Sequence, residues 1–415
     1  MGRGGPVLGP HPVRGLSPLR PGGRHGPLRD LTRSRGIRVA ARAAPILRFD
    51  WILLSAVLGL GVSGVLLVWS ASRAALLQVG ADPQTYLKKQ LLNLVIGLIV
   101  MFAVGLVGDR RLRTCAPVAY LATLLGLLAV LSPLGTSVNG ARAWISLPGG
   151  YQAEPSEFAK LGLILMTAWI LGQADTENAR PGIRAVAVAL ACAAPAIVLV
   201  AAEPALGVTV LLIVLLVSLI VLSGTRLRWL AVLAGSAALV ALAIWRMHLL
   251  KPYQLHRLAA FLHPGADPAG TGYSAAQSKI AVGSGGLLGQ GLFHGQLITG
   301  SFIPEQHTDF IFAAAGEELG FVGAVTIVVL LGIVIVRALL IAARAGDLFG
   351  MLVAGGIAIW FAVQGFINIG MTIGMVPVTG LPLPLVSYGG SAMFADMLAV
   401  GALQAIHLRH AAVPG

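Results

Sequence analysis

The segment Phe302-Ile-Pro-Glu-Gln-His-Thr-Asp-Phe310 leads directly into an apolar run over residues 310–341. A run of this length and composition is long enough to cross the hydrocarbon core of a bilayer as a helix. The whole chain of 415 residues is 57% hydrophobic and only 11% charged, against about 25% charged in an average soluble domain. The sequence therefore predicts an integral membrane protein with polar groups retained beside a membrane boundary, where charges are costly and tend to be functional.

Ten apolar runs along the chain predict ten transmembrane helices in an all-α fold. They lie near residues 50–70, 88–107, 114–132, 156–172, 182–201, 205–222, 227–245, 310–341, 348–375 and 390–408. We expect a membrane domain over 49–410, with a large extracellular loop over 245–310 between the seventh and eighth helices.

The N-terminal residues 1–48 contain ten arginines, one acidic residue and many Pro and Gly. This composition predicts a disordered basic tail, and basic residues beside membrane spans favour the cytoplasm. The turn Asp109-Arg-Arg-Leu-Arg113 is basic as well. We therefore expect both termini in the cytoplasm. The basic residues on the cytoplasmic side of the membrane then account for the net charge of +13. We therefore expect no nucleic-acid partner.

With this orientation, the polar segments rich in Gly and Pro fall on the outer face. They are 135–160, 202–207, 251–309 and 376–391. The segments on the inner face are short and ordinary. Whatever chemistry the protein performs is thus expected on the side of the membrane opposite its termini.

The first of these segments carries Arg142 and, after Glu154-Pro155, Ser156, Glu157 and Lys160. Ser156 is a candidate N-cap, and Glu157 and Lys160 share one helix face because they are three residues apart. One interpretation is a capping carboxylate with a lysine reaching out of the bilayer. The other is a buried ion pair beside a polar cavity, with Arg142 offering a fork for phosphate.

The next segment contains Lys279, a glycine-rich stretch over 283–291, and then Glu305, His307 and Asp309. The glycines lack the spacing and the βαβ context of a dinucleotide site, and they favour a flexible or re-entrant loop. Asp309 lies where the loop meets the eighth helix. It is either an N-terminal cap or a partly desolvated general base. His307 as a metal ligand is disfavoured, because no second histidine has ligand spacing.

Two further polar groups accompany these segments. Glu317 and Glu318 are adjacent acids in an apolar run, and we interpret them as a structural polar network. The proline-rich stretch 378–391 ends in Ser387 and Ser391. It is typical of a re-entrant turn, and its hydroxyl and amide groups could also hold phosphate.

Together these stretches resemble the SEDS family (shape, elongation, division and sporulation), the membrane glycosyltransferases typified by RodA and FtsW, with SpoVE among them. The resemblance rests on Gly140-Ala-Arg142, Pro155-Ser-Glu157-Phe-Ala-Lys160, Gln277-Ser-Lys279, Pro304-Glu305 with His307-Thr-Asp309, and Pro382-Leu-Pro-Leu-Val-Ser-Tyr-Gly-Gly-Ser391. The stretch from Gly380 and the segment Gly291-Leu-Phe-His294-Gly295 are more similar to RodA than to FtsW.

The resemblance implies that the protein polymerises lipid II, a disaccharide-peptide on undecaprenyl pyrophosphate, at the outer face of the bacterial cytoplasmic membrane during cell elongation. It implies Asp309 as catalytic base and a class B penicillin-binding protein as partner. It also implies a substrate site that leaves room for a divalent cation, Mg²⁺ or Mn²⁺. The implied substrate-binding residues are Arg142, Glu157, Lys160, Lys279, Glu305, His307, Ser387 and Ser391.

The sequence departs from the family motifs at the outer ends of two helices. Glu154 and Glu203 stand where the motifs have glutamine, and Ala205 stands where they have aspartate. Two other functions compete with the glycosyltransferase. A flippase of the lipid precursor should have polar groups through the bilayer and repeated halves, which we do not find. A scaffold of the elongation machinery needs no carboxylate at the loop–helix junction.

Overall fold

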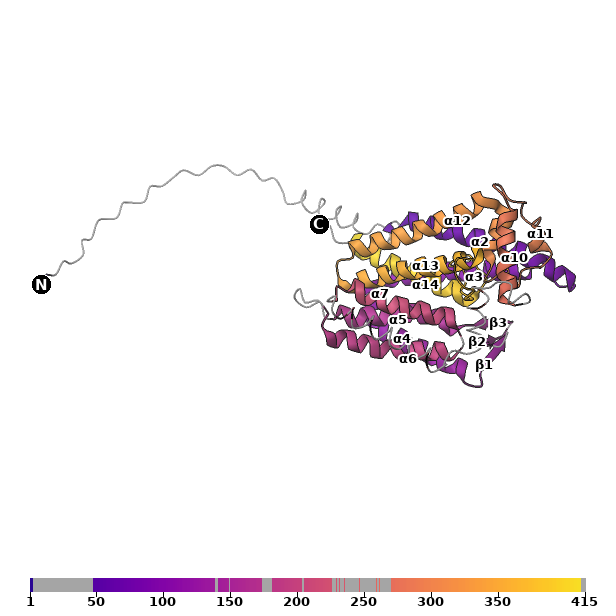
Figure 1. Cartoon of the computed structure of the whole chain (residues 1–415). Helices are drawn as coiled ribbons and strands as arrows, with labels where there is room; N and C mark the ends of the chain where they lie inside the picture. Colours follow the sequence, from indigo (N-terminus) through magenta and orange to yellow (C-terminus); the bar gives the residue numbers. More distant parts are fainter. Residues whose placement is uncertain are drawn as a thin grey trace, which may run out of the picture. The chain divides into compact units, whose positions relative to one another are not determined.

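The computed structural model describes residues 48–138, 141–148, 150–173, 181–203, 205–225 and 270–411, with Met1, Gly2 and a few isolated positions besides. The chain divides into two units, 1–47 and 48–415, and the second unit contains the helical bundle (Figure 1). The predicted basic tail, the predicted seventh helix at 227–245 and the loop up to residue 269 lie essentially outside the described residues.

The other nine predicted runs all form helices in the described part of the chain. These are α2 (Trp51–Gln78), α3 (Thr85–Val107), α4 (Asp109–Leu131), α5 (Pro155–Gly172), α6 (Ile183–Ala202), α7 (Leu206–Leu222), α12 (Ile311–Arg344), α13 (Leu348–Ile373) and α14 (Gly390–Ala411). Seven of them are long and apolar enough to cross a membrane, and α7 is a shorter apolar helix.

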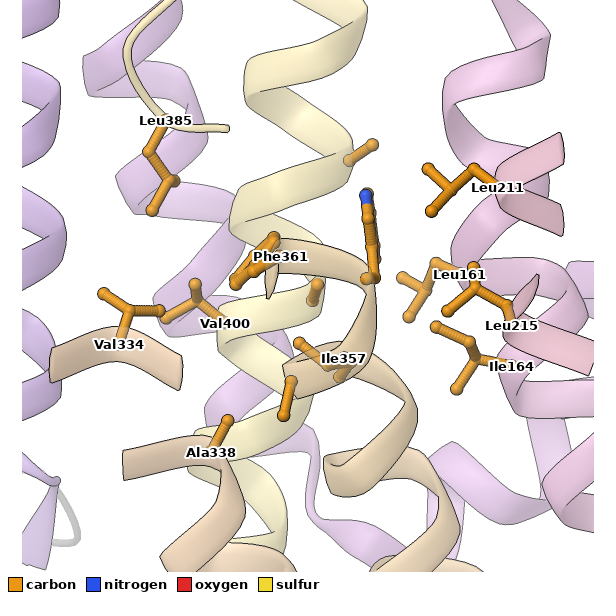
Figure 2. Close-up of a cluster of buried hydrophobic side chains, with 14 of the residues drawn as sticks. Leu161, Ile164, Leu211, Leu215, Val334, Ala338, Ile357, Phe361, Leu385 and Val400 are labelled. Carbon is orange, nitrogen blue, oxygen red and sulfur yellow. The ribbon is translucent and has the colours of Figure 1, made fainter. Parts of the chain in front are cut away.

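Helix α5 lies at the centre of the bundle, because it packs against α4, α6, α7, α13 and α14. Its side chains are buried almost from end to end. Figure 2 shows Leu161 and Ile164 of α5 facing Ile357 of α13 and Leu215 of α7. The outer helices instead expose large apolar side chains such as Leu125 on α4. Helices that are apolar on all sides are suited to lipid on one face and to protein on the other.

A three-stranded antiparallel sheet corrects the expectation of an all-α fold with a plain polar loop here. The strands are β1 (Gly135–Val138), β2 (Ala141–Leu147) and β3 (Tyr151–Ala153), in the order β1-β2-β3. Ile145 pairs with Gly135 on one side and with Ala153 on the other. The strands are short, and their β-branched and aromatic residues are too few to give a clear alternation in the sequence.

The segment predicted to be a flexible loop contains two helices, α10 (Thr271–Ser284) and α11 (Gln296–Thr299). The glycine-rich stretch is also ordered, because it pairs with a kink in α12 at Gly320, where φ is 66°. The amides of Gln290 and Gly291 donate to the carbonyls of Glu317 and Glu318, at 2.9 and 3.0 Å. The stretch therefore satisfies backbone groups that the kink leaves without helical partners.

The sheet, α10 and α11 lie at the same end of the long helices (Figure 1). The polar segments that the sequence grouped on one face are therefore also grouped in space, as far as the described residues extend. The candidate site lies at this end, where α5, α12, α13 and α14 converge.

Candidate active site

The centre of the site is an ion pair in the first turns of α5. Lys160 Nζ lies 2.6 Å from Glu157 Oε2, and both side chains are almost completely buried. The predicted pairing is therefore confirmed. Ser156 is not the N-cap, because α5 begins at Pro155 and Glu154 occupies the cap position. The Ser156 hydroxyl instead donates to Glu154 Oε1 at 2.8 Å.

Two residues of α13 complete the surroundings of the Lys160 ammonium. Lys160 Nζ donates to Gln364 Oε1 at 2.9 Å and lies 4.8 Å from the centre of the Trp360 ring. Trp360 Nε1 donates to the same amide oxygen of Gln364 at 2.7 Å. The cation is thus held by a carboxylate, an amide and an aromatic face, with no exposed surface.

The same face of α13 holds the two loops that bear the candidate catalytic residues. Gln364 Nε2 donates to the carbonyl of Pro382 at 2.8 Å. One helical turn further on, Asn368 Nδ2 donates to the carbonyls of Asp309 and Leu381, at 2.8 and 2.7 Å. Sequence reasoning missed Gln364 and Asn368. The available signal was amide side chains four residues apart within an apolar run, which share one helix face.

Asp309 is half-buried at the junction between its loop and α12. Its amide donates to the carbonyl of Glu305, a residue whose φ of 54° makes a tight turn. The N-cap of α12 is Phe310, which follows Asp309 and has no capping side chain. Gly380 of the neighbouring loop lies against the Asp309 side chain, because a Cβ there would be 3.5 Å from Oδ2.

His307 lies within a cluster of aromatic rings beside Asp309. Its ring centre is 4.9 Å from that of Tyr86 and 5.6 Å from that of Tyr388. Burial lowers the pKa of His307, and the nearby Glu305 opposes this only partly. The imidazole is therefore neutral near pH 7, and it can donate or accept a hydrogen bond.

The two predicted serines connect these segments to one another. The Ser387 hydroxyl donates to the carbonyl of Thr308 at 2.6 Å and accepts from the amide of Leu383 at 2.8 Å. The Ser391 hydroxyl accepts from the amide of Glu154 at 2.8 Å. Asp396 of α14, which sequence reasoning missed, accepts from the amide of Leu385 at 2.8 Å. These side chains fix the proline-rich loop against α5, α12 and α14.

Three other predicted residues make local contacts elsewhere. The Arg142 guanidinium on β2 donates to the carbonyls of Gly135 and Ser132, at 3.2 and 2.6 Å. Lys279 on α10 lies across Gly374, the left-handed residue that ends α13. Glu305 is exposed and accepts from the Thr308 hydroxyl at 3.1 Å. Their substrate contacts remain predictions.

Glu317 and Glu318 are confirmed as structural. Glu317 accepts from the amides of Leu297 and Ile298, at 2.8 and 3.0 Å, and so caps α11. Glu318 accepts from the Ser70 hydroxyl at 2.5 Å and from the amide of Phe293 at 3.1 Å. The two acids bind the loop before α12 to α12 itself and to α2, rather than facing one polar cavity.

An apolar cavity of about 390 Å³ lies directly beneath the N-terminal end of α5. Its walls come from α4, α5, α14 and the end of β3, and include Ala119, Ala153, Phe158, Gly162 and Leu398. Gly126 and Gly162 let α4 and α5 approach closely at this wall, because a Cβ at Gly162 would lie 2.7 Å from Thr123 Oγ1 and one at Gly126 would lie 3.1 Å from Pro155 Cβ. The cavity is lined by apolar residues except for Thr123 and lies beside the polar loops, an arrangement that fits an amphipathic ligand.

The charged groups of the site are mostly acidic. Burial, with the charge of Glu157 nearby, raises the pKa of Glu154 to about 7, and the charge of Asp309 acts in the same direction. Among the described residues, no group of three or more His, Cys, Asp and Glu side chains could hold a metal ion. Binding of the expected Mg²⁺ or Mn²⁺ stays a prediction.

Comparison with known proteins assigns this architecture to a family. The model of the FtsW/RodA/SpoVE family, described as cell cycle proteins, matches residues 50–411. The peptidoglycan glycosyltransferase MrdB of Escherichia coli K12 is 37% identical over 358 residues, which are 86% of this chain and 93% of MrdB. The stage V sporulation protein E of Bacillus subtilis is 36% identical over 85% of this chain and 95% of its own length.

Solved structures agree with these sequence matches. A chain of a peptidoglycan synthase complex that coordinates polymerization and crosslinking has a TM-score of 0.72 and 32% identity, covering 87% of this chain and 98% of that one. The rod shape determining protein RodA of Thermus thermophilus has a TM-score of 0.62 and 30% identity, covering 86% of this chain and 96% of its own.

Proposed function

The chain belongs to the FtsW/RodA/SpoVE family of multi-pass bacterial membrane proteins, and from this premise we propose that it is a peptidoglycan glycosyltransferase that polymerises lipid II. One observation carries the proposal. Asp309 is half-buried, and its main-chain carbonyl is held by Asn368. The neighbouring proline-rich loop is connected through Gln364 to the buried Glu157–Lys160 pair. The relatives' names support the reaction type.

In the proposed reaction, the Asp309 carboxylate takes the proton from the 4-hydroxyl of the acceptor sugar. The hydroxyl oxygen forms a bond to the anomeric carbon of the donor sugar, and the bond from that carbon to the pyrophosphate breaks. The electron pair leaves with the lipid pyrophosphate. A well-placed general base contributes about 10²–10⁴ in rate to such a step.

The Glu157–Lys160 pair has a positioning role in this proposal. The Lys160 ammonium is fully buried and balanced by Glu157, so it acts through the residues that it holds. Lys160 donates to the side chain of Gln364, and Gln364 donates to the carbonyl of Pro382. On the same helix, Asn368 donates to the carbonyls of Leu381 and Asp309. Fixing the base within a fraction of an ångström matters, because a misplacement of about 1 Å can cost about 10² in rate.

The substrate, location and partner follow from the same premise. The apolar cavity beneath α5 takes part of the polyprenyl chain while the sugars lie among the outer loops. The reaction takes place on the outer face of the membrane, as the basic inner turns favour.

A class B penicillin-binding protein crosslinks the product, and the peptidoglycan synthase complex among the structural relatives supports such a partner. The similarity to RodA motifs favours a role in cell elongation.

The test is purified protein in proteoliposomes with labelled lipid II, with and without a candidate class B partner. Wild type should give long glycan strands, and Asp309→Asn should give none while remaining folded. Movement of lipid II between leaflets without polymerisation would favour the flippase instead. No reaction of either kind with any partner would favour the scaffold.

A further inference from the structure

The outer ends of α5 and α6 bring two glutamates together. Glu154 immediately precedes α5, and Glu203 immediately follows α6. The two helices pack against each other. Glu203 has no exposed surface, and within the described residues neither of its carboxyl oxygens has a hydrogen-bond partner. A buried, unpartnered carboxylate is strongly disfavoured, so Glu203 is held as the neutral acid.

Glu154 lies close enough to Glu203 and to the charged groups of the candidate active site to interact with them electrostatically. The charged groups that act on it, among the described residues, are Glu157 and Lys160 of α5 and Asp309 of the loop before α12. Glu154 itself acts on Glu203, whose pKa is raised to about 8 by burial and then by this neighbouring acid. The Ser391 hydroxyl anchors the Glu154 amide, and Ser156 donates to Glu154 Oε1.

We propose that Glu154 and Glu203 share one proton, and that the resulting acid–carboxylate pair positions the first turn of α5 for glycosyl transfer. Glu203 supplies an O–H donor, and Glu154 supplies the accepting carboxylate through one bridging water molecule, because the two carboxyl groups make no direct hydrogen bond. The inference rests on the proposed glycosyltransferase function. The two glutamates are positioning residues, because they act through Glu157, Lys160 and the Ser391 contact rather than on the substrate.

This pair makes the site sensitive to pH in a defined direction. While one proton is present, the pair carries a single negative charge and can close a hydrogen bond. When the proton is lost, two carboxylates face each other and repel, and the ends of α5 and α6 are driven apart.

A carboxyl group whose pKa is higher in the folded state than in the unfolded state stabilises the fold at low pH. That contribution falls as pH rises from about 4.5 to about 8.

The experiment compares polymerisation rates and thermal unfolding of wild type, Glu203→Gln and Glu154→Gln between pH 6 and pH 10. For wild type we expect the rate to fall about tenfold for one pH unit above a midpoint near 8. Glu203→Gln should remove this fall, because a glutamine amide keeps a donor that cannot be lost. The matched control is Asp82→Asn, an exposed acid in the turn between α2 and α3, which should keep the wild-type profile.

Two readouts separate this inference from the proposed function. If wild type and Glu203→Gln have the same rate profile and the same dependence of Tm on pH, the shared proton is disproved. If wild type does not polymerise lipid II at any pH, the proposed function fails. The pair is then supported only if Glu203→Gln still removes the fall of Tm with pH, and it is rejected if it does not.

Discussion

The side-chain amide of Asn368 donates a hydrogen bond of 2.8 Å to the main-chain carbonyl of Asp309, 59 residues earlier in the chain. Its second bond, to the carbonyl of Leu381, ties the proline-rich loop to the same point. One buried amide on α13 thus joins the Asp309 loop to the proline-rich loop. The position of the Asp309 loop thus depends on a buried side chain of α13.

Replacing Asn368 by Leu keeps the volume of the side chain and removes both donors. We expect the polymerisation rate to fall about 10–100-fold, because the Asp309 loop loses its anchor and small misplacements of a base are costly. The loss should appear in kcat more than in KM. Phe366→Ala, on an exposed position of the same helix, is the control and should retain activity. Wild-type kcat in Asn368→Leu would show that the anchor is dispensable.

The Glu157–Lys160 pair predicts strong coupling between two substitutions. Removing either partner leaves the other charged and buried, which typically costs about 3–5 kcal/mol. Glu157→Ala and Lys160→Ala should each abolish polymerisation, and the double variant should cost little more than either one. A double-mutant cycle on the free energy of unfolding measures the coupling. Additive effects of the two changes would contradict a mutually dependent pair.

The orientation in the membrane predicts which loops an impermeant reagent can reach from outside. In a variant without Cys115 and Cys192, Gly283→Cys should react with an impermeant maleimide applied to intact cells, whereas Arg111→Cys should react only after lysis. Both positions are exposed in the structure, and a Cβ at Gly283 meets no neighbouring atom within 4 Å. Labelling of both from the same side would overturn the assigned topology.

The sequence predicts the helices well because each apolar run is long and is read independently of the others. It also predicts the Glu157–Lys160 pair, whose members are neighbours on a single helix face. Gln364 and Asn368 escape prediction because their partners, Lys160 and Asp309, are 204 and 59 residues away. Sequence spacing carries no information about such contacts.

Other features that the sequence did not show have local causes. The sheet escapes prediction because β3 has only three residues. A phosphate contact of Arg142 stays a prediction, and in the structure its Nε and one Nη donate to the carbonyls of Gly135 and Ser132. The sequence could not show that these main-chain carbonyls, which follow the end of α4, take their hydrogen-bond donors from Arg142. In the sequence Glu203 is only a departure from a motif, and its lack of partners among the described residues becomes visible once the helices are packed.

The last prediction separates a catalytic Asp309 from a merely structural one. Asp309→Asn keeps the size of the side chain and an oxygen that can accept hydrogen bonds, but it cannot take a proton at neutral pH. A structural role therefore predicts that Asn is tolerated and that Ala is the more damaging change. The N-cap of α12 is Phe310, so a capping role for Asp309 already has little geometric basis.

A catalytic role predicts instead that Asp309→Asn and Asp309→Ala both lower the rate by about 10²–10⁴, the usual contribution of a general base. Both proteins should unfold at temperatures close to wild type and should still bind lipid II, because the main-chain carbonyl that Asn368 holds is unchanged. The measurements are strand synthesis by the purified variants, thermal unfolding, and lipid II binding without turnover. Asp309→Asn that polymerises at a near wild-type rate would remove Asp309 from the mechanism. Loss of binding together with loss of rate would assign Asp309 to substrate recognition rather than to proton transfer.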